Sequence, residues 1–153
     1  MPISLTAPDI ARLTAGSPSR FDLSLRLLRT RPLESAAEIG VWKGDFAKVI
    51  LSNFSNLTKY YMIDPWAHLL DWNKPFNVDD RTFEDVYAEA LPKTDFAASR
   101  RIVLRGRMSA VIDEIPDQSL DFPYIDGDHT LRGNNSGPHA GAAKDKGRRP
   151  HWR

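Results

Sequence analysis

The sequence predicts an α/β protein: a mostly parallel β-sheet of about four strands with helices on both faces. Three observations support this. Apolar runs of strand length alternate with segments whose apolar residues recur at helical spacing. Proline, glycine or aspartate separates most of these segments. Polar residues follow each expected strand. Alternating strands and helices are joined by crossover connections, which give parallel strands covered on both sides.

The first segments of the chain show the start of this alternation. Residues 1–19 contain three prolines and a glycine, so we expect them to be irregular. Residues 20–30 place leucines and Phe21 on and beside one face and are expected to form a helix that Pro32 ends. The small apolar run 35–41 has the length of a buried strand.

The next two segments repeat the pattern. Residues 44–54 carry apolar side chains at helical spacing, with Asp45 in the first turn, where a carboxylate favours the helix dipole. Residues 58–63 are rich in strand-forming side chains and stop at Asp64 and Pro65. We therefore expect a helix followed by a second strand.

The later segments complete the expected sheet. Asp79 or Asp80 is placed to cap a helix that runs to Leu91. The remaining expected elements are a short strand at 101–104, a short helix at 108–115 and a fourth strand at 120–125.

The composition is that of an ordinary globular protein and excludes several kinds of site. Of 153 residues, 41% are hydrophobic and 27% charged, which suits one domain with a sizeable core. The chain has no cysteine, so disulfides, thiolate metal sites and cysteine nucleophiles are excluded. No apolar run approaches the length of a membrane span, and the N-terminus lacks the apolar core of a signal peptide. We therefore expect a cytoplasmic protein with no membrane partner.

A glycine-containing bend follows the first expected strand and includes Glu38, Gly40 and Gly44. Glycine allows a sharp turn and lets a ligand approach the backbone, and the helix that follows presents unpaired N–H groups. The spacing matches neither the G-x-G-x-x-G of dinucleotide-binding folds nor the Gly-Lys-Ser/Thr of a P-loop. Taken alone, the bend is equally well explained as a plain strand-to-helix turn.

Asp64 ends the second expected strand, where an acid is placed to accept hydrogen bonds from both hydroxyls of a ribose. Its distance along the chain from Gly44 is about that of the acidic residue in nucleotide-binding βαβ units. The alternative is a turn residue before a proline. Together with the glycine bend, Asp64 favours a ligand that contains adenosine.

Two carboxylates and an imidazole follow the fourth expected strand, at Asp126, Asp128 and His129. Such groups suit a divalent cation or a proton acceptor, although two carboxylates are too few ligands for a complete metal site. The alternative is the turn chemistry of an Asp-Gly pair.

Three motifs in this order carry a resemblance to a known family. EIGVWKGDF at 38–46, YYMIDPW at 60–66 and LDFPYIDGDHT at 120–130 resemble class I S-adenosylmethionine-dependent methyltransferases related to sugar and small-molecule O-methyltransferases. The resemblance covers about residues 20–133. It implies a Rossmann-like sheet, S-adenosyl-L-methionine as cofactor, and methyl transfer to a small-molecule acceptor, which we expect to be methylated on oxygen.

The resemblance also implies roles for individual residues. The cofactor-binding set that it implies is Glu38, Gly40, Gly44, Asp64, Arg107, Met108, Ser109 and Asp126. The first three would lie beneath the methionine part, Asp64 would hold the ribose, and 107–109 would border the adenine. Asp126 would lie near the sulfonium and the acceptor, and it is the metal ligand, for Mg²⁺, in metal-dependent relatives. Asp128 and His129 are candidates for the base that deprotonates the acceptor, with a plain turn role as the alternative for His129.

The chain departs from the family in two places. Pro123 lies inside the fourth expected strand, where a proline removes a ladder hydrogen bond that a central strand needs. After Gly133, the helix, Gly-Gly turn and further strands of the family are not recognisable. Against the family's pattern, we therefore expect 20–133 to be a partial cofactor-binding domain whose sheet is incomplete.

Residues 134–153 are expected to be a disordered basic tail, because they lack periodicity and aliphatic core residues. Their net charge is +4, so the rest of the chain, whose total is +1, carries −3. One hypothesis is that this tail is a frameshifted translation, in which case we expect a marginal fold and weak or absent catalysis; the gene sequence would test it. The alternative is a natural basic tail that binds nucleic acid in a salt-dependent way. The mildly acidic remainder favours no nucleic-acid partner.

The segment 66–76 contains Trp66, Trp72 and Phe76. It is expected either to form an aromatic lid over the acceptor or to pack on the core as an ordinary loop.

Three functions remain open at this point. The first is a methyltransferase domain, and the second is a fragment of an NAD-dependent oxidoreductase, which shares the expected sheet and Asp64 but requires a different glycine spacing. The third is a non-catalytic remnant that binds neither ligand.

Overall fold

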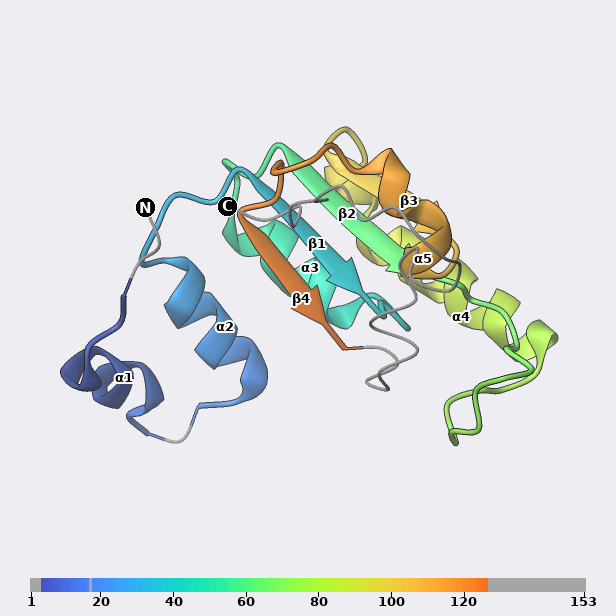
Figure 1. The fold of residues 1–153 in the computed structure, drawn as a ribbon, viewed down its shortest axis with the longest axis horizontal. Coiled ribbons are helices and arrows are strands. Elements are labelled where there is room, and N and C mark those ends of the chain that lie inside the picture. The colour runs from blue at the N-terminus through green and yellow to red at the C-terminus, as the bar shows by residue number, and fades with distance from the viewer. Residues whose placement is uncertain (1–3, 17, 127–153) are drawn as a thin grey trace, which may run out of the picture.

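Four parallel strands form one sheet in the order β3-β2-β1-β4 (Figure 1). The computed structural model describes residues 4–16 and 18–126. The strands are β1 (Ser35–Ile39), β2 (Lys59–Asp64), β3 (Arg101–Arg105) and β4 (Phe122–Ile125). The chain builds outward from β1 to β3 and then returns to place β4 on the other side of β1. The strand order therefore reverses between β1 and β4, which is the position where open α/β sheets bind ligands.

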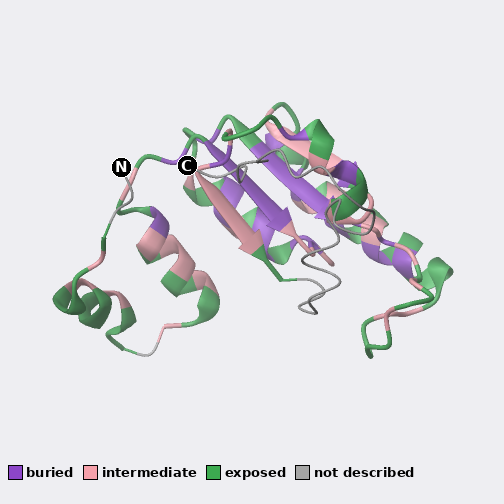
Figure 2. Cartoon of the chain, viewed as in Figure 1, coloured by how far each residue is buried: buried purple, intermediate pink, exposed green. Residues whose placement is uncertain are grey.

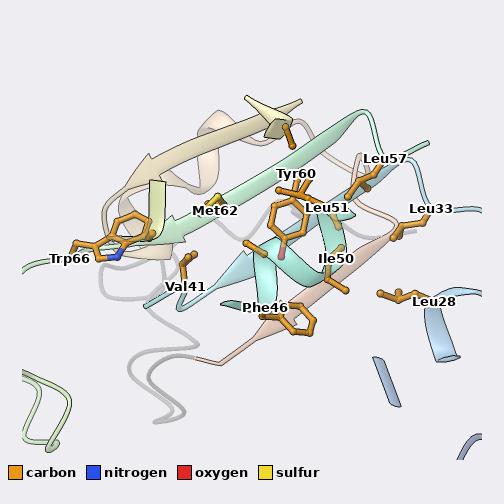
Figure 3. Close-up of a cluster of buried hydrophobic side chains, with 14 of the residues drawn as sticks. Leu28, Leu33, Val41, Phe46, Ile50, Leu51, Leu57, Tyr60, Met62 and Trp66 are labelled. Atoms are coloured by element: carbon orange, nitrogen blue, oxygen red, sulfur yellow. The ribbon is translucent and has the colours of Figure 1, made fainter. Parts of the chain in front are cut away.

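Helices cover both faces of this sheet, as the sequence predicts. The elements are α2 (Arg20–Leu28), α3 (Asp45–Asn53), α4 (Asp80–Lys93), α5 (Met108–Val111) and the 3-10 turn η2 (Ile112–Glu114). Side chains of α2, α3 and α4 pack with Tyr60 and Met62 of β2 in the larger core cluster (Figure 3). On the opposite face, Tyr61 and Ile63 of β2 pack against a second cluster, which includes Val111 of α5, Ile115 after η2, and Leu120. Successive side chains of β2 therefore enter the two core clusters in turn, as in a strand buried on both faces. Figure 2 shows β1 and β2 as the buried centre of the sheet.

The N-terminal segment contains a helix where the sequence led us to expect irregular structure. This helix, α1 (Ala7–Thr14), begins at Thr6, whose hydroxyl accepts from the Asp9 N–H while the Asp9 carboxylate accepts from the Thr6 N–H. Such a capping box satisfies N–H groups that the first turn leaves unpaired, and Pro8 is tolerated there because its missing N–H is not needed. The prolines that suggested breakage therefore lie at a helix start or outside the helix.

The other expected elements are confirmed, with small changes at their ends. The third long helix continues past Leu91 to Lys93, with Pro92 in its last turn. The expected helix 108–115 is one α-helical turn followed by η2. A short 3-10 helix, η1 (Asp95–Ala97), lies before β3 and was not expected. Within the described ranges, no helix is long and apolar enough to cross a membrane.

Pro123 lies in β4 without disturbing the pairing of β4 with β1. Asp126 donates its N–H to the Ile39 carbonyl at 2.8 Å. In a parallel strand, the backbone groups of alternate residues bond to the same neighbouring strand. The backbone of Tyr124, like that of Asp126, therefore bonds toward β1, and the backbone nitrogen of Pro123 is directed to the outer edge of the sheet. Among residues 4–16 and 18–126, no strand pairs with that edge. The expected cost of a proline in a central strand therefore does not arise between these four strands.

Candidate functional site

A cavity of about 710 Å³ lies at the carboxyl ends of the strands. Each strand contributes to its wall: Glu38 and Gly40 at the end of β1, Asp64 at the end of β2, residues 106–108 after β3, and Asp126 after β4. The cavity therefore joins residues that are far apart in the sequence but that parallel strands bring to one edge.

Asp64 holds the glycine bend in place. Its Oδ2 accepts the N–H groups of Val41 and Trp42, each at 2.9 Å, and its Oδ1 accepts the N–H of Trp66 at 2.8 Å. The side chain is buried, and burial raises its pKa, while the three backbone hydrogen bonds act in the opposite direction. The bend and the acid that the sequence singled out are therefore in direct contact.

The same carboxylate fixes two tryptophans in an unusual backbone conformation. Trp42 has φ 55° and Trp66 has φ 41°, a region that bulky side chains rarely adopt. The indole Nε1 of Trp66 donates to the Trp42 carbonyl at 2.9 Å, which ties the two turns together. Strained backbone of this kind persists where surrounding contacts over-determine it and is frequent at functional sites.

Glu38 is a buried acid at the floor of the cavity. It is 2% exposed, and its Oε2 accepts the hydroxyl of Tyr60 at 2.9 Å. Burial raises the pKa of Glu38 well above 4.5; the Tyr60 hydrogen bond acts against this shift, and the charges of Asp64 and Asp126 reinforce it. Glu38 therefore has a strong tendency to hold a proton unless a cation comes close.

The two glycines of the bend have different roles. Gly40, with φ 90°, lines the cavity and donates its N–H to the Ile63 carbonyl at 2.8 Å. Gly44, with φ 78°, caps α3 and is not part of the cavity wall. A Cβ on Gly44 would lie 3.1–3.3 Å from atoms of Ala90, so glycine here allows α3 to approach α4. Gly44 therefore has a packing role, and its expected place beneath the cofactor stays a prediction.

Two of the three residues expected from the loop after β3 line the cavity. Arg107 and Met108 line the cavity, whereas Ser109 does not. The Arg107 guanidinium forms an ion pair with Asp71, which links this loop to the segment after β2.

Asp126 lines the cavity but faces a cation of the protein rather than other acids. Its Oδ2 lies 2.5 Å from Nη1 of Arg20, at the start of α2. Arg20 also lines the cavity, and the sequence offered no sign of this because the two residues are 106 positions apart. Among residues 4–16 and 18–126, no group of three His, Cys, Asp or Glu side chains is placed to hold a metal ion.

The aromatic segment divides between the core and the cavity. Trp66 is 1% exposed and packs in the larger core cluster, so it is no part of a lid. Trp72 and Phe76 line the cavity, and Phe76 lies edge-on to Trp42 with ring centroids 5.4 Å apart. The Nε1 of Trp72 is buried and has no hydrogen-bond partner within the described part of the chain.

The two candidate bases, Asp128 and His129, lie outside the described residues, as does the tail 134–153. Of the other expected site residues, those that the structure gathers around the cavity are Glu38, Gly40, Asp64, Arg107, Met108 and Asp126.

Comparison with known proteins agrees with this arrangement. A family model described as a methyltransferase domain matches residues 37–136, which is more than half of the chain. The comparison with curated proteins gives no match. The matched range begins in β1 and includes the glycine bend, Asp64, the loop after β3 and Asp126, so it contains most of the cavity wall. The resemblance drawn from the three motifs is confirmed at the level of the family: the chain belongs to the methyltransferase-domain family.

Proposed function

We propose that this protein binds S-adenosylmethionine in the cavity and transfers its methyl group to an oxygen of a small-molecule acceptor. The observation that carries the proposal is the contact between Asp64 and the bend, because Asp64 and the backbone of Gly40 then line one cavity, as a ligand with a ribose would require. Oδ1 of Asp64 accepts only one backbone N–H, which leaves it capacity for a ribose hydroxyl.

The wall of the cavity suits this cofactor. Its volume lies within the range of about 300–1,000 Å³ found for small-molecule sites. Glu38 and Asp64 lie on the part of the wall near β1, where a positively charged sulfonium bound beside Glu38 would favour the ionised form of this acid. Trp72, whose Nε1 has no hydrogen-bond partner among the described residues, also lines the cavity.

The protein's own groups would contribute mainly by positioning and electrostatics. When bound, the cofactor supplies a methyl group on a positively charged sulfur. Gly40 would let the ligand approach the backbone, and Asp64 would orient it by accepting a ribose hydroxyl. Trp72 and Phe76 would exclude water from the open side.

The removal of the acceptor proton is assigned to Asp128 or His129 as a proposal from the sequence. The donor set does not fit Mg²⁺, because Asp126 is engaged by Arg20 and the described part of the chain gathers no three ligands.

Calorimetric titration of the full chain tests the proposal. S-adenosylhomocysteine, the product form of the cofactor, should bind, and NAD should not. Binding of NAD in its place would support an oxidoreductase, and binding of neither would support a remnant without ligand. If S-adenosylhomocysteine binds, transfer of a labelled methyl group to phenolic and sugar hydroxyls then tests the reaction itself.

A further inference from the structure

The ion pair between Arg20 and Asp126 stands at one end of the cavity. Arg20 is held at the start of α2, whose Phe21 packs against Phe46 of α3 with ring centroids 5.6 Å apart. Asp126 follows β4 directly. Both side chains are partly exposed, at 60% for Arg20 and 36% for Asp126. A pair in this position contributes little to folding stability and can be exchanged for other partners at small cost.

The order of the strands indicates which part of the proposed ligand would lie at this end of the cavity. The wall runs from Arg107 and Met108 after β3, through Asp64 at β2, to Glu38 at β1 and Asp126 after β4. S-adenosylmethionine is a linear molecule with adenine, ribose, sulfur and an amino-acid end in that order. If its ribose lies at Asp64 and its adenine toward β3, its amino-acid end reaches β1 and β4, where Arg20 faces Asp126.

We infer that Arg20 and Asp126 together bind the amino-acid end of the cofactor, an inference that rests on the proposed function. That end is a zwitterion, with one ammonium and one carboxylate. The Arg20 guanidinium matches the carboxylate as a planar, two-pronged donor, and the Asp126 carboxylate matches the ammonium. One ion pair within the protein is thereby replaced by two with the ligand, and every charge keeps a partner of opposite sign.

Other cations on the cavity wall are less suited to this role. Lys43 forms an ion pair with Glu89 at 3.1 Å, and Arg107 is paired with Asp71 on the side of β3. Lys74 belongs to the segment after β2. Arg20 alone among the described cations of the wall is paired with the residue that follows β4, beside the point where strand order reverses.

A comparison of two ligands tests this inference. S-adenosylhomocysteine carries the amino-acid end, whereas 5′-methylthioadenosine keeps the adenosine and the thioether but lacks it. Each is titrated by calorimetry into the wild-type chain, Arg20→Met, Arg20→Lys and the control Arg29→Met. The control alters an arginine at the opposite, C-terminal end of α2, where Arg29 hydrogen-bonds Asn53.

We expect Arg20→Met to weaken S-adenosylhomocysteine by about 10- to 100-fold, the loss that follows when a hydrogen-bonded charge is removed. Its affinity for 5′-methylthioadenosine should stay within about 2-fold of the wild type, which also shows that the variant is folded. Arg20→Lys should lose less, and Arg29→Met should change neither affinity.

Two different failures are distinguishable in this experiment. If the wild type binds both ligands and Arg20→Met weakens both equally, or neither, the role of Arg20 and Asp126 is wrong while the proposed function stands. If the wild type binds neither ligand, the proposed function and this inference are both wrong.

Discussion

At the scale of single residues, Asp64 and Glu38 show how buried acids shape the site in different ways. The Asp64 carboxylate accepts hydrogen bonds from three backbone N–H groups and so holds the bend and the turn after β2 together. Glu38 accepts one hydroxyl, from Tyr60, and lies close to two other acids. The first acid is therefore compensated by hydrogen bonds, whereas the second is compensated by holding a proton.

The buried Glu38 makes the stability of the protein depend on pH. Because its pKa is raised in the folded state, the folded chain keeps a proton that the unfolded chain releases above pH 4.5. Folding stability from this group therefore falls as the pH rises from 4.5 to the raised pKa. Glu38→Gln should remove this decline, which amounts to at most about 1.4 kcal/mol per pH unit.

Urea unfolding at several values between about pH 5 and pH 8 measures the effect. The matched control is Glu114→Gln, which changes an exposed acid and should follow the wild type. Equal pH dependence in Glu38→Gln and the wild type would show that Glu38 is not the source.

At the scale of the elements, the contact between α3 and α4 depends on the absence of one side chain. Gly44 has φ 78° and would bring a Cβ to 3.1–3.3 Å from Ala90. Gly16 has the same φ, but a Cβ there would meet nothing within 4 Å. A comparison of substitutions at the two glycines therefore distinguishes the loss of stability due to backbone conformation from the loss due to close packing.

Gly44→Ala should lower the free energy of unfolding by about 2–4 kcal/mol, because the left-handed backbone and the overpacking both contribute. Gly16→Ala should lower it by about 1–2 kcal/mol, from the backbone alone. Chemical denaturation of both variants gives the comparison. If the two alanines cost the same, the close approach of α3 to α4 is not limited by Gly44.

The sequence predicted the strands and long helices because their apolar spacing is local. It missed α1 because the prolines were read as breaks, although Thr6 and Asp9 form a capping box that their spacing could have revealed. It could not place Arg20 in the cavity, since only the folded chain brings α2 to the end of β4. It also could not tell that Trp66 lies in the core while Trp72 and Phe76 line the cavity, because this depends on which side chain the turn after Asp64 directs into the core.

At the scale of the whole molecule, the sheet arranges four chemically different strand ends in a row. Apolar and cationic groups follow β3, acids end β2 and β1, and a paired acid follows β4. A linear ligand with an aromatic base at one end and a zwitterion at the other suits this row in one direction only. If the proposed cofactor binds here, this order of strand ends predicts its orientation.

A crystal structure of the full chain with S-adenosylhomocysteine tests this claim most directly. We expect the ribose at the Asp64 carboxylate, the adenine beside Arg107 and Met108, and the amino-acid end between Arg20 and Asp126. A ligand bound in the opposite direction, or away from the ends of the strands, would contradict it.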